Sequence, residues 1–310
     1  MQRDEGDAMT TGAHGTAAGY GSAARLVERS AAALAASIPA DPADDGFFGP
    51  ASVTWRLSAD LSGPVAGLRS LLLQALHPLA MAGVDQHSDW RGDPVGRLAS
   101  TSAYLATISY GDRAAAERAA NRVRKIHETV RGTDTVTGRP YAADDPDLLL
   151  WVHAALVDSN LAAAELFGRP LSAADADRYV AEMTAAAELV GVPAGMAPAS
   201  VAELAVYLDG VRPELIKTPA AAESMDYLLS LPGLDEDIAD IWREIADGAA
   251  ASLPGWAISM YGRDAAPLTP ERRTQIRQAL GVLDVVFLGE PGVLEARQRI
   301  ELRMRRARRG

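Results

Sequence analysis

The sequence predicts an all-α protein, and three observations support this. Aromatic residues make up only 5% of the chain and alanine is abundant, which favours closely packed helices over sheets. Residues that start and stop helices recur along the chain, with Ser, Thr or Asp at the starts and Gly at the ends. No period-2 run of β-branched residues is long enough to predict a strand. The best strand candidate, VLDVVFLG at 282–289, fits the end of a helix equally well.

The chain is expected to form one helical domain over residues 23–310, after a disordered tail at 1–22. That tail lacks the basic start and apolar stretch of a signal peptide. A first amphipathic helix is expected at about 22–38. A second helix, apolar on all sides, is expected at 61–84, and Pro78 must kink or interrupt it because proline lacks an N–H donor.

The middle of the chain predicts two helices that each carry one histidine. The first runs from the cap Asp112 to the stop Gly132, and the second from Asp145 to Gly168, with a Gly/Pro loop between them. Apolar residues recur on both at steps of three and four. His127 and His153 fall within these apolar stripes. We therefore expect this pair at the centre of the fold, with two imidazoles facing its interior.

Further helix starts lie on both sides of this pair. Asp93-Pro94 opens a helix that ends at Gly111, and two capping boxes open helices at 172–190 and 200–209. Thr218-Pro219 and Thr269-Pro270 mark two more. The last helix, at 291–310, is rich in arginine. It is expected to be a solvated terminal helix, with peripheral membrane contact as the alternative.

Composition excludes several classes of function. The net charge of −11 argues against nucleic acid, because binding phosphates needs a basic face. The chain has no cysteine, which removes disulfides and thiolate chemistry. No phosphate loop, GxSxG elbow or HExxH pair is present. No apolar stretch is long enough to span a bilayer, and we expect a soluble, cytoplasmic protein.

Histidines are the remaining candidates for chemistry. His77, His87, His127 and His153 are far apart in the sequence, unlike the ligands of a clustered metal site. A haem needs only one neutral imidazole in apolar surroundings. His153 fits this best, with Leu149, Leu156 and Val157 around it. Residue type alone favours the alternative, a core histidine held by a hydrogen bond.

Several motifs together resemble one oxygenase family. They are LLLQALHPLAMAGV at 71–84, RVRKIHETVRG at 122–132 and GRPYAADDPDLLLWVHAALVDSNL at 138–161. Their order and spacing are similar to the family of rubber oxygenase (latex-clearing protein) and the fungal mycophenolic-acid oxygenase MpaB, over roughly residues 50–260. The resemblance implies a globin-like fold that binds haem b through one histidine and uses dioxygen. The 26-residue separation of His127 and His153 is similar to that in the rubber-oxygenase pattern, and the resemblance implies that the downstream residue, His153, is the axial iron ligand.

The resemblance also suggests other site residues. Arg118, Arg122 and Lys125 match a cationic cluster near the haem, and Arg122 is expected either to reach a propionate or to face solvent. The aligned stretch SAYLATISY carries no acidic base, so Thr101 and Tyr104, with His127, are the catalytic candidates.

The two remaining histidines allow more than one interpretation. His77 could line the distal side of a haem pocket, although a bond to a carbonyl freed by Pro78 is favoured. His87 is expected to make a local turn contact.

The resulting hypothesis is a haem b (iron) oxygenase that uses dioxygen on an apolar isoprenoid, polyketide or other alkene, with an electron donor as a further possible partner. Two alternatives stay open at this point. One is a haem-binding or haem-sensing protein without turnover. The other is a helical binding module without a cofactor.

Overall fold

The computed structural model describes residues 28, 31–32, 35–38, 43–231, 234, 236–264, 267–290 and 292–309. The predicted tail at 1–22 and most of the helix predicted at 22–38 lie outside this range. The described residues are mostly helical, which confirms the predicted fold class. The elements are α2 (Val53–Ser58), α3 (Gly63–Gln74), α4 (Pro78–His87), α5 (Pro94–Tyr110), α6 (Arg113–His127), β1 (Arg131–Thr133), β2 (Pro140–Ala142), α7 (Pro146–Phe167), α8 (Ala173–Val190), α9 (Val201–Val211), η1 (Arg212–Glu214), α10 (Pro219–Ser230), α11 (Glu236–Ala251), α12 (Gly255–Met260), α13 (Pro270–Leu288) and α14 (Val293–Ala307).

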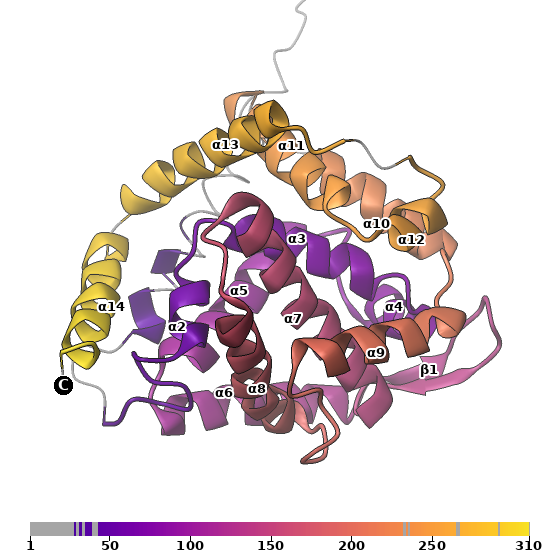
Figure 1. Ribbon diagram of the computed structural model, residues 1–310. Helices are drawn as coiled ribbons and strands as arrows, with labels where there is room; N and C mark the ends of the chain where they lie inside the picture. The colour runs from indigo at the N-terminus through magenta and orange to yellow at the C-terminus, as the bar shows by residue number, and fades with distance from the viewer. Residues whose placement is uncertain are drawn as a thin grey trace, which may run out of the picture.

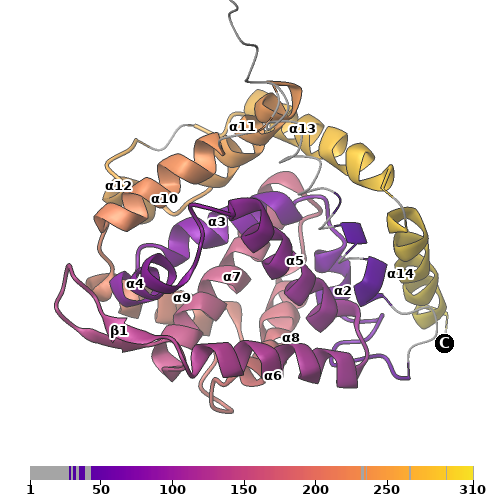
Figure 2. The same ribbon diagram turned by 180° about the vertical axis from the view of Figure 1, so that it is seen from behind.

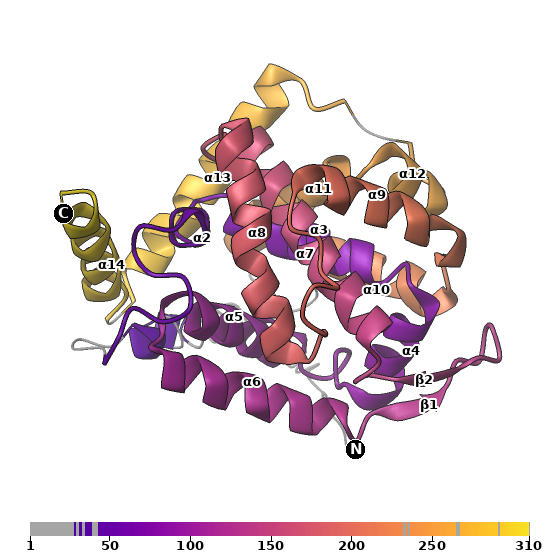
Figure 3. The same ribbon diagram turned by 60° about the horizontal axis from the view of Figure 1, so that its bottom comes forward.

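Helix α7 lies at the centre of the fold. α3 packs along it, α8 covers another side, and α11 and α13 pack on the side of α3 away from the hairpin (Figure 1). The view from behind shows α6 below α7 and α14 at the outer edge (Figure 2). Figure 3 shows α8 in front of α7, with the β1–β2 hairpin beside α4. The predicted central position is therefore confirmed for α7, whereas α6, the other helix of the expected central pair, lies at the edge of the fold.

Side-chain caps start the helices where the sequence predicted them. In each case the side-chain oxygen of the capping residue accepts a backbone N–H from the first turn of its helix, which satisfies one of the donors that a helix start leaves unpaired. The caps that behave in this way are Asp93, Asp112, Asp145, Ser172, Ser200 and Thr218.

Pro78 interrupts the predicted helix at 61–84, as expected. α3 ends at Gln74, α4 begins at Pro78, and the two axes differ by 104°. The indole N–H of Trp151 donates to the Gln74 carbonyl (3.2 Å), and the Ile216 N–H donates to the Leu76 carbonyl (2.8 Å), so carbonyls freed at the break find partners. No single described helix is long and apolar enough to cross a membrane; α3 and α4 pass that test only together, as this bent pair.

The structure differs from the sequence prediction between residues 127 and 142. α6 ends at His127 rather than at Gly132, and an antiparallel hairpin of β1 and β2 follows where only a loop was expected. The Asp134 carboxylate closes its turn by accepting the backbone N–H and hydroxyl of Thr137. The buried Tyr141 ties β2 to α4. VLDVVFLG forms the end of α13, not a strand.

A buried ion pair joins α3 to α7. Arg69 is only 3% exposed; its guanidinium contacts Asp158 at 2.7 Å, and donates to the Ser159 hydroxyl and to the Ser252 carbonyl. Asp158 and Ser159 lie on α7 and Ser252 directly follows α11, so Arg69 fixes the register of α3 against α7 and the end of α11.

Removing this guanidinium should destabilise the fold strongly. Arg69→Met leaves Asp158 without its cation and the Ser159 hydroxyl and Ser252 carbonyl without this donor, and we expect the free energy of unfolding to fall by about 3 kcal/mol. Urea denaturation measures this loss. The matched control is Arg243→Met, which breaks the exposed pair with Asp240 and should cost less than about 0.5 kcal/mol. Equal losses in the two variants would contradict the structural role of Arg69.

Candidate functional site

His153 lies in the third turn of α7, and the helix buries it. Asp145 caps α7 and Pro146 occupies its first turn, so the helix start is fixed locally. The His153 side chain is 7% exposed, and burial lowers the pKa of its imidazole to about 4. The ring is therefore neutral at neutral pH, with one nitrogen lone pair available to a Lewis acid.

The surroundings of His153 differ from those of an ordinary core histidine. The structure records no hydrogen bond between the His153 ring and any described residue. The residue as a whole is buried, but its ring nitrogens are not among the buried polar atoms without a partner, so they keep some accessible surface. The chemistry of this donor therefore fits a ligand that lies outside the polypeptide.

The predicted apolar neighbours of His153 divide between two clusters. Leu149 packs with Leu150, Ala187 and Val192, between α7 and the end of α8. Val157 belongs to a second cluster with residues of α2 and α8, against which the half-buried Leu156 packs. These contacts fix the rotation of α7 about its own axis. They therefore also fix the direction in which the His153 side chain points.

His127 is the last residue of α6 and is half-buried. Its Nδ1 is buried without a partner among the described residues, and burial lowers the pKa of the ring. Asp144 opposes this shift and Arg97 reinforces it, so both charged groups lie near the imidazole. The structure thus brings His127 close to the start of α5 and to the residues just before α7.

The cationic cluster of α6 faces solvent. Arg118, Arg122 and Lys125 are all exposed and, at steps of four and three, share one face of the helix. Ala116 and Ala120, which are fully buried, lie on the opposite face. Of the two orientations that we expected for Arg122, the structure shows the one toward solvent.

Thr101 and Tyr104 lie on α5, one and two turns after Arg97. Thr101 is exposed, and its hydroxyl donates to the Arg97 carbonyl (3.0 Å). The Tyr104 hydroxyl is buried without a described partner, and burial raises its pKa to about 12, so it stays protonated. Tyr104 packs against Ile108 and α6, and neither residue is an acidic base.

His77 lies on the other side of α7 from His153. It is buried against Trp151, with ring centroids 6.1 Å apart, and near the ion pair of Arg139 and Glu214. Because Trp151 and His153 are two residues apart on one helix, they point in nearly opposite directions. The Nδ1 of His77 has no described partner, so the expected bond from this atom to a carbonyl is absent.

His87 makes a long-range contact. It ends α4, and its Nε2 lies 3.1 Å from the hydroxyl of Tyr141 in the hairpin. The expected local turn contact was wrong, because no local pattern indicates that β2 folds back onto α4.

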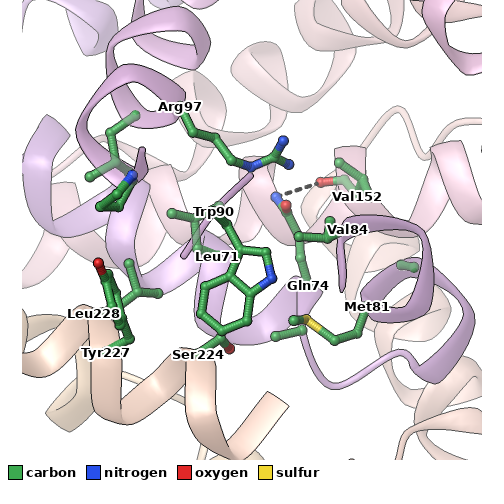
Figure 4. Close-up of a pocket in the computed structure, with 14 residues that line it drawn as sticks. Leu71, Gln74, Met81, Val84, Trp90, Arg97, Val152, Ser224, Tyr227 and Leu228 are labelled. Carbon is green, nitrogen blue, oxygen red and sulfur yellow. Dashed lines mark hydrogen bonds between the residues drawn. The ribbon is translucent and has the colours of Figure 1, made fainter. Parts of the chain in front are cut away.

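A largely apolar pocket of about 120 Å³ lies beside α7, between α3, α4, α5 and α10 (Figure 4). Val152, the residue before His153, forms one end, and the side-chain amide of Gln74 donates to its carbonyl (3.4 Å). Trp90 forms a wall and stacks edge-on against Tyr227. Sequence reasoning missed Gln74, Trp90 and Arg97; for Arg97 the signal was its position one turn before Thr101.

Arg91 holds the Trp90 wall in place. Its guanidinium makes two hydrogen bonds of 2.7 Å to the Glu223 carboxylate of α10 and contacts Asp85 of α4 at 2.8 Å. It also lies 4.1 Å from the centre of the Trp90 ring. The loop between α4 and α5 is therefore fastened over the pocket from two helices.

The described structure combines helical layers, a buried neutral imidazole on α7 and an apolar pocket beside Val152. Residues 55–285 match the family described as "ER-bound oxygenase mpaB/B'/Rubber oxygenase, catalytic domain". The chain belongs to this family, as the motifs at 71–84, 122–132 and 138–161 indicated. No curated protein and no solved structure matches the chain. Among the described residues, no group of three or more His, Asp or Glu side chains could hold a metal ion.

The lowered pKa of His153 predicts a pH dependence of stability. The unfolded chain takes up this proton near pH 6.5, whereas the folded protein resists it until about pH 4. The associated stability is complete above about pH 6.5 and is lost as the pH falls toward 4, by up to about 1.4 kcal/mol per pH unit. Urea unfolding across this range should show this slope.

Two variants assign the slope to one residue. His153→Gln should reduce the slope, because glutamine does not titrate; His77 and His127, whose pKa values are also lowered, contribute the remainder. His87→Gln, at an exposed histidine, should leave the slope intact. A slope in His153→Gln equal to that of wild type would show that His153 does not contribute to the effect.

Proposed function

We propose that this protein is a haem b-dependent oxygenase that acts on an apolar small molecule, with His153 as the iron ligand. The observation that carries the proposal is the buried, neutral His153 imidazole without a described hydrogen-bond partner. Membership of the oxygenase family supports the reaction class. Haem already supplies four nitrogen ligands, so a single histidine completes the protein's share of the coordination.

The residues of this chain have separable roles in the proposal. His153 would hold the iron through its neutral nitrogen, and a bound haem would supply the chemistry of binding and activating dioxygen. The pocket beside Val152 would hold an alkene-bearing substrate and exclude water from it. His127 is neutral and lies close to Arg97, a residue that lines this pocket. It is therefore positioned to donate or accept a hydrogen bond at the edge of the pocket.

A haem titration tests the ligand assignment. Wild-type protein should develop a Soret band on addition of haemin, and His153→Ala should lose it while far-ultraviolet circular dichroism stays nearly unchanged. His127→Ala is the matched control, because it removes a different imidazole, which is half-buried. This variant should keep the Soret band and change its wavelength. If His153 is only a core histidine, the alanine variant instead loses about 1 to 3 kcal/mol of stability and the spectrum does not change.

Oxygen uptake separates an oxygenase from a haem protein without turnover. The haem-loaded protein should consume dioxygen when an alkene such as squalene or styrene is added, with and without ascorbate as the electron donor, and His153→Ala should not. A Soret band without alkene-dependent uptake in either condition would favour the sensing alternative. Wild-type protein that takes up no haem would favour a cofactor-free module.

A further inference from the structure

The pocket between α3, α4, α5 and α10 holds one cation in an apolar setting. Leu71, Met81, Val84, Trp90 and Leu98 form most of its walls. Arg97, from the first turn of α5, extends its guanidinium toward the end where Gln74 and Val152 lie (Figure 4). Such pockets gain their specificity from the few polar groups placed among apolar walls.

Arg97 has no acidic partner among the described residues. Its recorded side-chain hydrogen bond goes to the Ser88 hydroxyl at 2.7 Å, which leaves most of its donors unused. Arg97 is an exposed residue at the edge of the pocket, and the protein atoms on one side of its guanidinium lower its pKa through partial desolvation. Nearby Arg91 shows the contrast, since Asp85 and Glu223 both pair with it.

The indole N–H of Trp90 has no described partner, and the other polar side chains of the pocket are satisfied within the protein. The Gln74 amide donates to the Ser70 hydroxyl and to the Val152 carbonyl. The Ser224 hydroxyl donates to the Ala221 carbonyl, and the Tyr227 hydroxyl donates to the Arg91 carbonyl. Among the described lining residues, Arg97 is therefore the charged group that a ligand can still pair with.

We propose that this pocket binds a small apolar carboxylic acid, whose carboxylate pairs with Arg97 and whose hydrocarbon part lies against Trp90 and Met81. A carboxylate matches the planar fork of a guanidinium and neutralises its charge. The volume of about 120 Å³ is close to that of a cavity that holds one benzene ring, so the pocket encloses a single ring or part of a chain, and the rest of a longer chain extends through its open side. The idea that this acid is the oxygenase substrate rests on the proposed function; its binding does not.

Tryptophan quenching tests this proposal without turnover. 8-Bromooctanoate carries a bromine that quenches tryptophan fluorescence on contact, and Trp90 lines the pocket. The acid should quench wild-type protein saturably, and Arg97→Gln should weaken its binding at least about tenfold, as expected for a lost charge-assisted hydrogen bond. Arg97→Lys should recover part of the affinity. Trp90→Phe should remove most of the quenching.

Three controls make the result specific. The neutral analogue 8-bromooctan-1-ol should bind wild type and Arg97→Gln equally, because it has no charge to pair. Arg122→Gln, an exposed arginine of α6, should bind the acid like wild type. Equal affinity of the acid for wild type and Arg97→Gln would overturn the proposal.

A haem propionate also carries a carboxylate that can pair with Arg97. One further measurement distinguishes a propionate from the proposed small acid. The proposal expects haem-loaded protein to bind 8-bromooctanoate as haem-free protein does. Loss of acid binding on haem loading, together with weaker haem binding in Arg97→Gln, would overturn the proposal in favour of a propionate. If the protein binds no haem, the proposed function fails. The quenching result on the haem-free protein still decides whether the pocket binds the acid.

Discussion

The structure depends on the burial of α7 by α3, α8, α9 and α13 along most of its length. Each polar group on a helix in this position must find a partner or serve a purpose. Asp158 and Ser159 meet Arg69 of α3, and the Asn160 amide donates to the Leu156 carbonyl. His153 is the exception on this helix. The packing that satisfies its neighbours therefore also holds one neutral imidazole in a defined direction without a described partner.

The break at Pro78 explains why a pocket exists beside α7. A continuous helix at 61–84 would run past α7, but the 104° turn sends α4 away and opens a space bounded by α5 and α10. The Arg91 contacts with Asp85 and Glu223 then fasten the α4–α5 loop across it. Pro78 and the three charged residues Asp85, Arg91 and Glu223 thus shape the pocket that Arg97 lines.

Local signals predicted much of the fold, and long-range contacts account for what they missed. The caps Asp93 and Asp145 gave the starts of α5 and α7 because capping is a local interaction. The β1–β2 hairpin was missed since Tyr141 is held by α4, far away in the sequence. Periodicity placed His153 in the interior. It could not place Arg97 in a pocket whose walls come from several elements, because periodicity does not show how separate helices are positioned against one another.

The central claim is that an external iron atom satisfies the His153 ring. Resonance Raman spectroscopy of the reduced, haem-loaded protein tests it most directly, because a histidine ligand gives an iron–histidine stretching band. The account predicts this band in wild type, its loss in His153→Gly, and its return when free imidazole fills the space left by the side chain. A band that persists in His153→Gly without imidazole would contradict the account, since another residue would then hold the iron.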